Sequence, residues 1–500
     1  MALPTRQTRH PAPLEGTTQN AQPWLMLAVL LLGQFMCLID VMVVNVAMPS
    51  IAASLHASGA SLQLIVGGYT IAYAMLLITG ARLGDRYGRR RTYLVGAGVF
   101  TAASLACALA PDSQVLIGFR LVQGAGAAVL VPQVFSIIQL TFTGPARARA
   151  LSAYAAVLSA GAVAGLVLGG VVVTANLFGT SWRPVFAINV PLGIALALLV
   201  PRLVPADAPC SIPGSIPGPT RRLDVSGLLI AAGSVLLIVL PLVLGREEGW
   251  PAWCFGCIAV GAALAVMFVV VERTVAARGG DPLLNLAVLR ARALPSGLVT
   301  LAFTQVGYGG LLFAFTLHLQ AGLGQSALRA GLSYLPMVTV FGLAGYHWRR
   351  LPAAARRVLV PAGLAISAVA YLGLAAGLYT SVGALTWTGL AGAGLGLGLS
   401  VSPLLTQSLV HVPAARAADA SGLLTTTVQL GQLMGVAAIG SVYLSRAAGF
   451  SHAAAGRAAA SAGAMSGTAC WLAALSAAGL LAAAVMVRGV RGRRPLPRSR

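Results

Sequence analysis

The sequence predicts an all-α integral membrane protein with about 14 transmembrane helices, built as two six-helix bundles plus an inserted two-helix hairpin. Three observations lead to this prediction. The 500-residue chain is 58% hydrophobic and only 9% charged, whereas a soluble domain carries about 25% charged residues. Apolar runs long enough to cross a hydrocarbon core of about 30 Å recur along the whole chain. A proline-rich stretch separates the first six runs from the rest.

The apolar runs define the expected helices in chain order. They cover residues 24–48, 61–81, 92–110, 113–140, 150–175, 184–200, 224–244, 252–271, 294–319, 329–347, 357–378, 382–410, 420–444 and 467–487. A helix needs about 20 apolar residues to span a bilayer, and most of these runs reach that length. The first run is longer than the apolar region of a signal peptide, so we expect it to be a retained span.

The basic residues indicate how the spans are oriented. If the N-terminus is cytoplasmic, all but six of the 33 basic residues lie in the tails or in cytoplasmic loops. The exceptions are Arg120, Arg183, Arg246, Arg329, Arg446 and Arg457. This sorting is the positive-inside pattern. Because an odd number of spans would destroy it, the pattern favours 14 spans with both termini in the cytoplasm.

The same pattern divides the chain into regions. We expect a cytoplasmic N-tail at 1–23, an N-terminal six-helix bundle at 24–200, a Pro-rich cytoplasmic linker at 201–223, an inserted helix pair at 224–271, a C-terminal six-helix bundle at 272–487 and a basic cytoplasmic C-tail at 488–500. The linker carries too little apolar sequence to form a core of its own, so it is expected to be a flexible connector.

Two ionisable residues within spans are the first candidates for a functional site. Asp40 lies in the first span and Arg120 in the fourth, with Gln123 one turn further on. A charge at the bilayer centre costs about 2.5–3.5 kcal/mol on insertion scales, so such residues usually serve a function. Asp40 is therefore a candidate proton carrier, and Arg120 a candidate partner. The alternative is that both are structural, each bonded permanently to a neighbouring helix.

Polar residues elsewhere in the spans could line a cavity. They are Gln34, Asn45, Gln123, Asn189, Gln305, His318, Gln429 and Gln432. Each one alone is better explained by a hydrogen bond between helices, but together they suggest a cavity with some polar lining. In the fifth span, Gly161, Gly165 and Gly169 recur every four residues, followed by Gly170. Such a face allows close helix packing or a hinge.

Several other functions are disfavoured. The net charge of +22 could suggest nucleic-acid binding, but the basic residues lie between apolar runs and form no aromatic-studded patch. The Cys254–Cys257 pair lacks a second CxxC and a nearby histidine, so no metal site is expected. The sequence contains no HExxH, Walker loop or nucleophile elbow. We therefore expect no enzyme, no metal and no cofactor.

With these residues in view, the chain resembles the major facilitator superfamily, specifically its fourteen-span drug:proton antiporter branch. The loop between spans two and three resembles the family motif through Leu83, Gly84, Asp85, Arg86, Gly88, Arg89, Arg90 and Arg91. The stretches "LGQFMCLIDVMVVNVAMPSI" (32–51), "RLVQGAGAA" (120–128), "WRPVFAINVPLG" (182–193), "DPLLNLAVLR" (281–290) and "ASGLLTTTVQLGQLMG" (420–435) also resemble this branch.

The resemblance implies a function. It implies a monomeric efflux transporter of the bacterial plasma membrane, driven by the proton gradient, that exports hydrophobic or amphipathic small molecules such as antibiotics by alternating access. Asp40 and Arg120 would couple proton movement to transport. The cytoplasmic gating loop would consist of Gly84, Asp85, Arg86, Gly88 and Arg89. The remaining alternatives are an importer or facilitator on the same fold and a membrane sensor that transports nothing.

Two positions depart from the family pattern. Leu166 stands where the span-five antiporter motif usually has a proline, so the kink that this proline would cause is not expected here. Ala81 replaces the leading glycine of the loop motif, with Gly80 beside it.

Overall fold

The structure, a computed structural model, describes most of residues 21–491. Residues 1–20, 177–178, 207–224, 246–247, 279, 281, 283–285, 292, 357, 381–382, 410–411, 413–416, 448–453 and 492–500 lie outside the description. The expected N-tail, most of the Pro-rich linker and most of the C-tail therefore lie outside the described residues.

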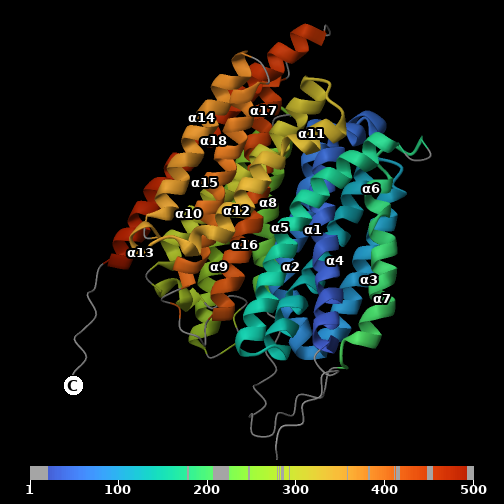
Figure 1. Cartoon of the computed structure of the whole chain (residues 1–500), viewed down its shortest axis with the longest axis vertical. Helices are drawn as coiled ribbons and strands as arrows, with labels where there is room; N and C mark the ends of the chain where they lie inside the picture. The colour runs from blue at the N-terminus through green and yellow to red at the C-terminus, as the bar shows by residue number, and fades with distance from the viewer. Residues whose placement is uncertain are drawn as a thin grey trace, which may run out of the picture.

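The first half of the chain forms a bundle of long helices (Figure 1). They are α1 (Ala21–Leu55), α2 (Gly59–Tyr87), α3 (Arg89–Ala108), α4 (Ser113–Thr141), α5 (Gly144–Ala175), the short α6 (Pro184–Ala187) and α7 (Asn189–Leu203). Side chains cap two of them. Ser58 accepts a hydrogen bond from the Ser61 amide, and Asp112 accepts one from the Val115 amide, which satisfies free N–H groups at the starts of α2 and α4.

The second half begins with a helix pair and continues with another bundle. The pair is α8 (Val225–Leu244) and α9 (Ala252–Ala277), which pack against each other. The bundle comprises η2 (Leu286–Arg290), α10 (Leu294–Leu317), η3 (His318–Gly322), α11 (Ala327–Ser333), α12 (Leu335–His347), η4 (Trp348–Arg350), α13 (Ala353–Arg356), α14 (Leu359–Thr380), α15 (Ala384–Leu409), α16 (Ala417–Met434), η6 (Gly435–Ile439), α17 (Gly440–Ala447) and α18 (Ala454–Arg491).

The described residues form helices and no strand, and 12 of these helices are long and apolar enough to cross a membrane. The protein is therefore a multi-pass membrane protein. Each of the fourteen expected runs is largely helical, but α3 and α5 do not belong to this set of 12. Helix α3 begins with three arginines, which lower its hydropathy, and in α5 the apolar stretch among the described residues is the shorter Ala164–Ala175. The structure thus supports the all-helical class, while 14 crossings and the role of α8 and α9 as an inserted hairpin stay predictions.

Several helix bounds differ from those expected. The run at 329–347 is divided at Tyr334 into α11 and α12, and α18 begins at Ala454 rather than near 467. Helix α7 continues to Leu203, so the first residues of the expected linker are helical. The added residues at the end of α7 and at the start of α18 include arginines and many small residues, which hydropathy alone does not mark as helix.

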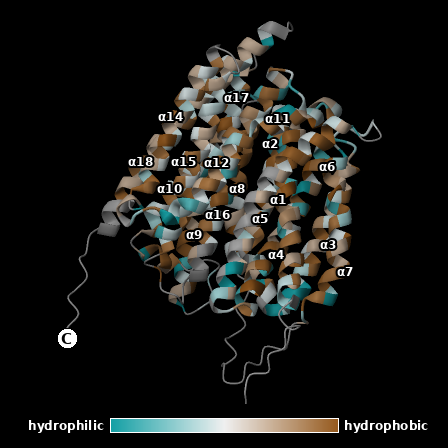
Figure 2. Cartoon of the chain, in the orientation of Figure 1, coloured by the Kyte–Doolittle hydropathy of each residue, from teal (hydrophilic) through white to brown (hydrophobic). Residues whose placement is uncertain are grey.

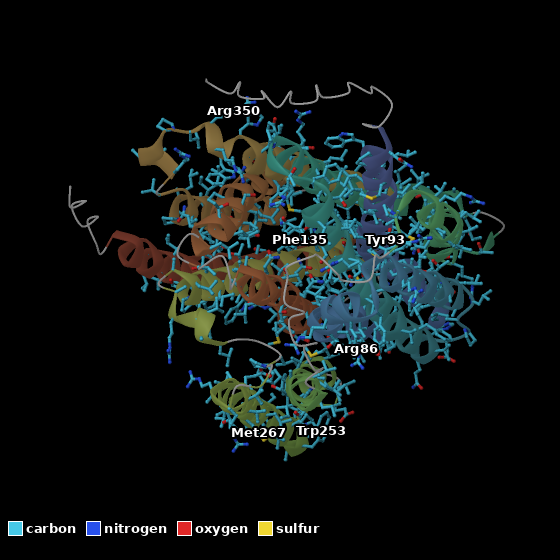
Figure 3. The ribbon with its side chains drawn as sticks, turned by 90° about the horizontal axis from the view of Figure 1, so that it is seen from below. Arg86, Tyr93, Phe135, Trp253, Met267 and Arg350 are labelled. Carbon is cyan, nitrogen blue, oxygen red and sulfur yellow. The ribbon has the colours of Figure 1, made fainter. Side chains whose placement is uncertain are left out.

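Apolar residues run along the helices in both halves of the chain (Figure 2), and many of their side chains are exposed. Leu481 is 73% exposed, Val369 70% and Val95 61%. Such exposure would be unfavourable in water, whereas hydrocarbon accepts these side chains without cost. Figure 3 shows α9, marked by Trp253 and Met267, at the edge of the molecule with α8 beside it. Helix α8 packs against α2, where Val239 and Val243 share a buried cluster with Ile71.

The buried apolar side chains show how the two bundles meet. One cluster combines α1 and α2 side chains such as Val46 and Leu62 with α10 and α11 side chains such as Phe315 and Ala330. A second cluster draws only on the first bundle and includes Met36 from the N-terminal half of α1. A third draws only on the second bundle. The bundles therefore share a core at one end and have separate cores at the end where α2 meets α3.

Candidate functional site

An ion pair lies inside the first bundle, between α1 and α4. Arg120 Nη1 donates a hydrogen bond of 2.5 Å to Asp40 Oδ2, and the two side chains are 1% and 0% exposed. The sequence proposed both residues separately, and the folded chain brings them into direct contact. Removing either partner would leave a buried charge without compensation, which typically costs about 3–5 kcal/mol.

Two amides complete the surroundings of the Asp40 carboxylate. Gln123 Nε2 donates to Asp40 Oδ1 at 2.7 Å, and Asn189 Nδ2 donates to the same oxygen at 2.8 Å. With Arg120, the carboxylate accepts three hydrogen bonds, and this arrangement suits its charged form. Gln123 and Asn189, expected as cavity residues, are thus partners of Asp40.

Arg120 is held on all sides. Its Nε donates to the Ile65 carbonyl at 3.1 Å, and its Nη1 also donates to Gln123 Oε1 at 2.6 Å. The guanidinium carbon lies 4.6 Å from the centre of the Tyr69 ring and 5.7 Å from that of Phe186. Aromatic faces attract a cation at such distances. The guanidinium is therefore stabilised both by acceptors and by rings from α2 and α6.

Ser104 is a member of the site that the sequence analysis missed. Its Oγ accepts hydrogen bonds from Gln123 Nε2 at 2.7 Å and from Asn189 Nδ2 at 3.3 Å, and it donates to the Phe100 carbonyl at 2.8 Å. Ser104 is fully buried in α3. A lone serine among alanines gives no sequence signal, since small hydroxyl residues are common in membrane helices. We call Asp40, Ser104, Arg120, Gln123 and Asn189 the Asp40 cluster.

The remaining candidate cavity residues lie away from this cluster. Gln34 accepts a weak hydrogen bond from Tyr154, and the Asn45 side chain donates to the Val41 carbonyl of its own helix. Gln305 is buried in α10, and Gln429 and Gln432 are half-buried in α16. Among the described residues, no hydrogen bond joins these five to the Asp40 cluster.

His318 belongs to a separate polar group in the second bundle. Its Nδ1 lies 2.7 Å from Ser461 Oγ, which is also 2.9 Å from the Tyr443 hydroxyl. All of these side chains come from the second half of the chain. His318 therefore links η3, α17 and α18 and makes no contact with Asp40.

The expected gating loop lies where α2 ends and α3 begins. Gly88 joins the two helices with φ of +93°, a conformation that glycine adopts without strain. Gly84 packs against the side chain of Gln133, and the exposed Arg86 lies over the Tyr87 ring. Arg89 has a partner in the structure. The side chain of Asp85 lies outside the described residues.

Arg82, near the end of α2, makes a hydrogen bond between the two halves of the chain. Arg82 Nη2 donates a hydrogen bond to the carbonyl of Pro282, within the quoted stretch 281–290. In the charge pattern, Arg82 is only a topology signal. It could have been proposed as a contact, because both stretches resemble family motifs and are expected on the same side of the membrane.

The glycine face of α5 packs against α1. A Cβ at Gly165 would lie 2.6 Å from Met42 Cβ, and one at Gly169 would lie 3.1 Å from the Val43 Cα. Gly161 meets Phe35 and Leu38 in the same way. Gly170 instead faces α11 of the second bundle, where a Cβ would lie 2.6 Å from the Leu328 Cα. The repeat therefore allows close packing on α1, with one glycine at the junction of the bundles.

Leu166 lies at the same junction. Its side chain is 2% exposed, and its carbonyl oxygen touches Gly331 of α11 so closely that a Cβ there would overlap it. Helix α5 is continuous from Gly144 to Ala175. The position that departs from the family pattern thus contributes backbone to the contact between bundles.

Two glutamines connect the bundles at the end with the shared core. Gln320 Nε2, from η3, donates to the Val46 carbonyl of α1 at 2.8 Å. Gln63 Nε2, from α2, donates to the Val436 carbonyl in η6 at 3.1 Å. Both second-bundle segments are π-helical, a geometry that frequently marks functional sites.

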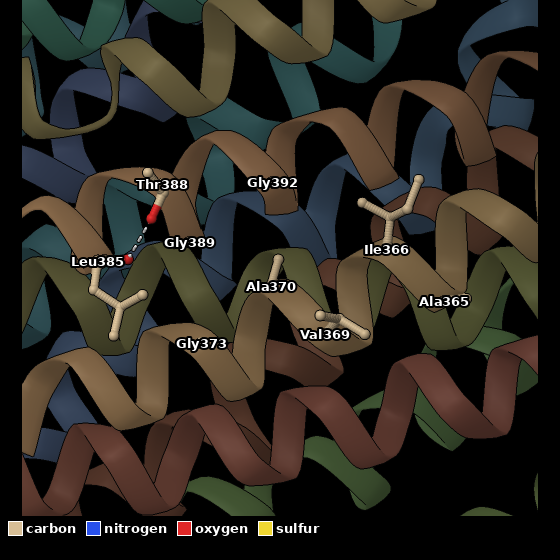
Figure 4. A pocket seen from close by; sticks show the side chains of 9 residues that line it. All are labelled: Ala365, Ile366, Val369, Ala370, Gly373, Leu385, Thr388, Gly389 and Gly392. Carbon is tan, nitrogen blue, oxygen red and sulfur yellow. Dashed lines mark hydrogen bonds between the residues drawn. The ribbon is translucent and has the colours of Figure 1, made fainter.

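The surface of the second bundle carries apolar grooves. Figure 4 shows a groove of about 450 Å³ between α14 and α15, with Ile366, Val369 and Leu385 on its walls. Its single hydroxyl, on Thr388, donates to the Leu385 carbonyl. Among the described residues, no group of three or more histidine, cysteine or acidic side chains could hold a metal ion.

A multi-pass helical protein with two bundles, close contacts at one end and a buried ion pair in one bundle has the architecture of a secondary transporter. A sequence model of the Major Facilitator Superfamily matches residues 30–436. The chain belongs to this family.

Known relatives support this assignment. The chain is 37% identical over 435 residues to the probable actinorhodin transporter of Streptomyces coelicolor, covering 86% of this chain and 74% of the relative. It is 34% identical over 426 residues to a cephamycin export protein of Amycolatopsis lactamdurans, covering 81% and 82%. A solved bacterial homologue of the human lysosomal transporter Spinster has the same fold, with a TM-score of 0.68, 17% identity and coverage of 97% and 100%.

Proposed function

We propose that the protein is a proton-coupled antiporter that exports hydrophobic or amphipathic small molecules, such as antibiotics, across the bacterial plasma membrane. The observation that carries this proposal is the buried Asp40–Arg120 pair. A carboxylate at 0% exposure is costly to bury, and such residues in membrane helices usually serve proton or ion movement, which favours coupling over a structural role. The relatives are named for the transport of actinorhodin and the export of cephamycin, which favours antibiotic-like substrates here.

The Asp40 cluster supports a proton cycle with defined partners. A proton that binds an Asp40 oxygen removes the negative charge to which Arg120, Gln123 and Asn189 donate. The hydrogen bonds to a neutral carboxyl group are weaker, so α4 and α7 are then held less firmly to α1. Loss of the proton restores all three. Protonation would in this way favour one arrangement of the helices and deprotonation the other.

The uneven packing of the bundles supports alternating access. The shared core and the Gln63 and Gln320 hydrogen bonds lie at the end opposite the arginine-rich loop, which we place outside the cell. Separate cores at the loop end would allow the bundles to part there. We assign this arrangement to the inward-facing state, with Arg82 and Gly88 at the cytoplasmic gate.

The topology follows from the charge pattern and the helix count. We propose 14 crossings, with α3 and α5 added to the 12 apolar helices, because their lengths of 20 and 32 residues suffice and both lie within the first bundle. The pair α8 and α9 is then an inserted hairpin, both termini are cytoplasmic, and one chain suffices for transport.

The test is drug-driven proton movement in proteoliposomes that hold the purified protein and an imposed ΔpH. A panel of neutral and cationic hydrophobic antibiotics is added one by one. We expect at least one compound to collapse ΔpH in the wild type but not in Asp40→Asn, which should still exchange labelled substrate without a gradient. Asp112→Asn is the matched control, since Asn also caps a helix well.

Other outcomes would overturn the proposal. If Asp40→Asn collapsed ΔpH as fast as the wild type, Asp40 would not carry the proton. If compounds moved down their own gradients while ΔpH stayed intact, the protein would be a facilitator. If no compound moved at all although several bound, a sensor role would follow.

A further inference from the structure

An arginine on the membrane-facing surface has no use in the transport cycle described above. Arg446 lies in the last turn of α17, and it is one of the six basic residues that escape the positive-inside pattern. Its side chain is exposed, and no hydrogen bond or ion pair joins it to any described residue. A guanidinium offers five donors and binds phosphate strongly, so this one is available to a ligand.

The arginine stands at a groove. A hollow of about 780 Å³ is lined by Leu372, Ala375 and Ala376 of α14, by Trp471 and Ala474 of α18, and by Arg446. Leu372 is 53% exposed and Trp471 51%, on helices apolar enough to span a membrane. The walls therefore meet lipid rather than water. Small alanines keep the groove open, and Arg446 is the one charged side chain among the residues that line it.

The backbone of α18 is shaped to receive the guanidinium. A Cβ at Gly467 would overlap Arg446 Nη1, so the arginine lies directly across the helix at a position without a side chain. Gly463, one turn earlier on α18, has nothing within 4 Å of its Cβ position. The contact is thus specific to Gly467. It directs the charge into the groove instead of along the end of α17.

The position along the membrane normal suits a headgroup. Helix α17 ends at the end of the molecule opposite the α2–α3 loop (Figure 1). Tryptophan is enriched at the level of lipid headgroups, where Trp471 accompanies Arg446. A helix C-terminus also favours a nearby cation, but that effect is small at an exposed site and leaves the guanidinium donors without acceptors.

We propose that this groove binds an anionic phospholipid, with its phosphate on Arg446 and an acyl chain along the apolar wall between α14 and α18. A guanidinium beside an apolar helix face can donate to a phosphate while the face accepts the acyl chain. The groove between α14 and α15 shown in Figure 4 has no charged side chain among its lining residues, so it would accept acyl chains without selecting a headgroup. This proposal does not depend on the proposed antiport.

The experiment is native mass spectrometry of the full, delipidated protein titrated with phosphatidylglycerol or with phosphatidylcholine of the same acyl chains. We expect phosphatidylglycerol to bind the wild type with about tenfold preference, because both lipids carry a phosphate but the choline cation of phosphatidylcholine offsets its charge and repels Arg446. Arg446→Gln should abolish the preference. Gly467→Ala should reduce it strongly, because the new methyl group displaces the guanidinium while the charge remains.

Two controls match these variants. Arg457→Gln removes another exposed arginine near the start of α18 that does not line the groove, and Gly463→Ala adds the same methyl group where nothing lies within 4 Å. Both should bind phosphatidylglycerol as the wild type does. Thermal melting without added lipid verifies that each variant is folded, and a variant that fails this test is replaced by Arg446→Ala or Gly467→Ser.

Three results would overturn the proposal. Equal binding of the two lipids by the wild type would remove the headgroup selectivity. An unchanged preference in Arg446→Gln would place the headgroup elsewhere. In the third result, millimolar inorganic phosphate would displace bound phosphatidylglycerol as effectively as added phosphatidylglycerol does. The site would then recognise a free anion, and the apolar wall would contribute nothing to binding.

Discussion

Arg120 Nη1 lies 2.5 Å from Asp40 Oδ2 in a site that excludes solvent from both side chains. The pair is separated by 80 residues along the chain and joins α1 to α4. Asn189 of α7 donates to the same carboxylate, and Ser104 of α3 accepts from both Asn189 and Gln123, so the Asp40 cluster joins four helices. This relationship underlies the first two predictions.

Asp40→Asn and Arg120→Gln are each expected to destabilise the protein by about 3–5 kcal/mol, because each leaves a buried charge unpaired. The double variant should lose clearly less than the sum, since it removes both charges. Thermal unfolding in detergent measures the cycle. The control pair is Asp40→Asn with Arg183→Gln. Among the hydrogen bonds described, the Arg183 guanidinium donates only to the Ala108 carbonyl, so the losses of stability of this pair should add. Additivity in the first cycle would contradict a direct energetic coupling.

Ser104→Ala should disturb proton coupling without removing a charge. Gln123 and Asn189 each lose an acceptor that holds their amides toward Asp40. We expect drug-driven proton movement to slow about fivefold, the equivalent of one hydrogen bond of about 1 kcal/mol. Thr70→Val, which deletes a buried hydroxyl bonded only to its own helix, serves as control. A rate of proton movement equal to that of the wild type would assign Ser104 a packing role only.

Gln320→Leu should weaken the closed end of the bundles. The substitution removes the hydrogen bond to the Val46 carbonyl, and one such bond contributes about 1 kcal/mol. We expect about a fivefold increase in the population with that end open, measured as distances between spin labels on the two bundles. The effect of Gln63→Leu should be similar.

Gln407→Leu is the control for both glutamine variants, because Gln407 bonds the Arg356 carbonyl within the second bundle. If it changed the distances as much as Gln320→Leu does, the contact between bundles would not be responsible.

Gly165→Ala should loosen the packing of α5 on α1. Its methyl group would lie 2.6 Å from Met42 Cβ and 3.1 Å from the Ile39 carbonyl oxygen, so backbone has to move. Overpacking of this kind costs about 1–3 kcal/mol. We expect a lower melting temperature and slower transport. Gly118→Ala, where the methyl group meets nothing within 4 Å, should melt no lower than the wild type, and equal losses in both would rule out the packing argument.

The fold class was predictable from the sequence because hydrocarbon imposes a simple rule. Every backbone polar group within the bilayer has to be satisfied locally, so long apolar runs become helices. The same rule made Asp40 and Arg120 conspicuous, since charges within such runs are rare. Hydropathy was less informative where arginines dilute a run, as in α3, and the number of crossings rests on charge sorting rather than on helix length.

The partners of each residue were decided only by the tertiary structure. Asn189 joins Asp40 while Gln34 and Gln305 do not, although all are polar residues in apolar runs. Ser104 gave no signal, and Arg446 counted only as an exception to a rule. Periodicity places a side chain on a face of its own helix, but the helices that meet that face depend on contacts between distant parts of the chain. The sequence thus determined which chemistry lies in the membrane, and packing determined which groups act together.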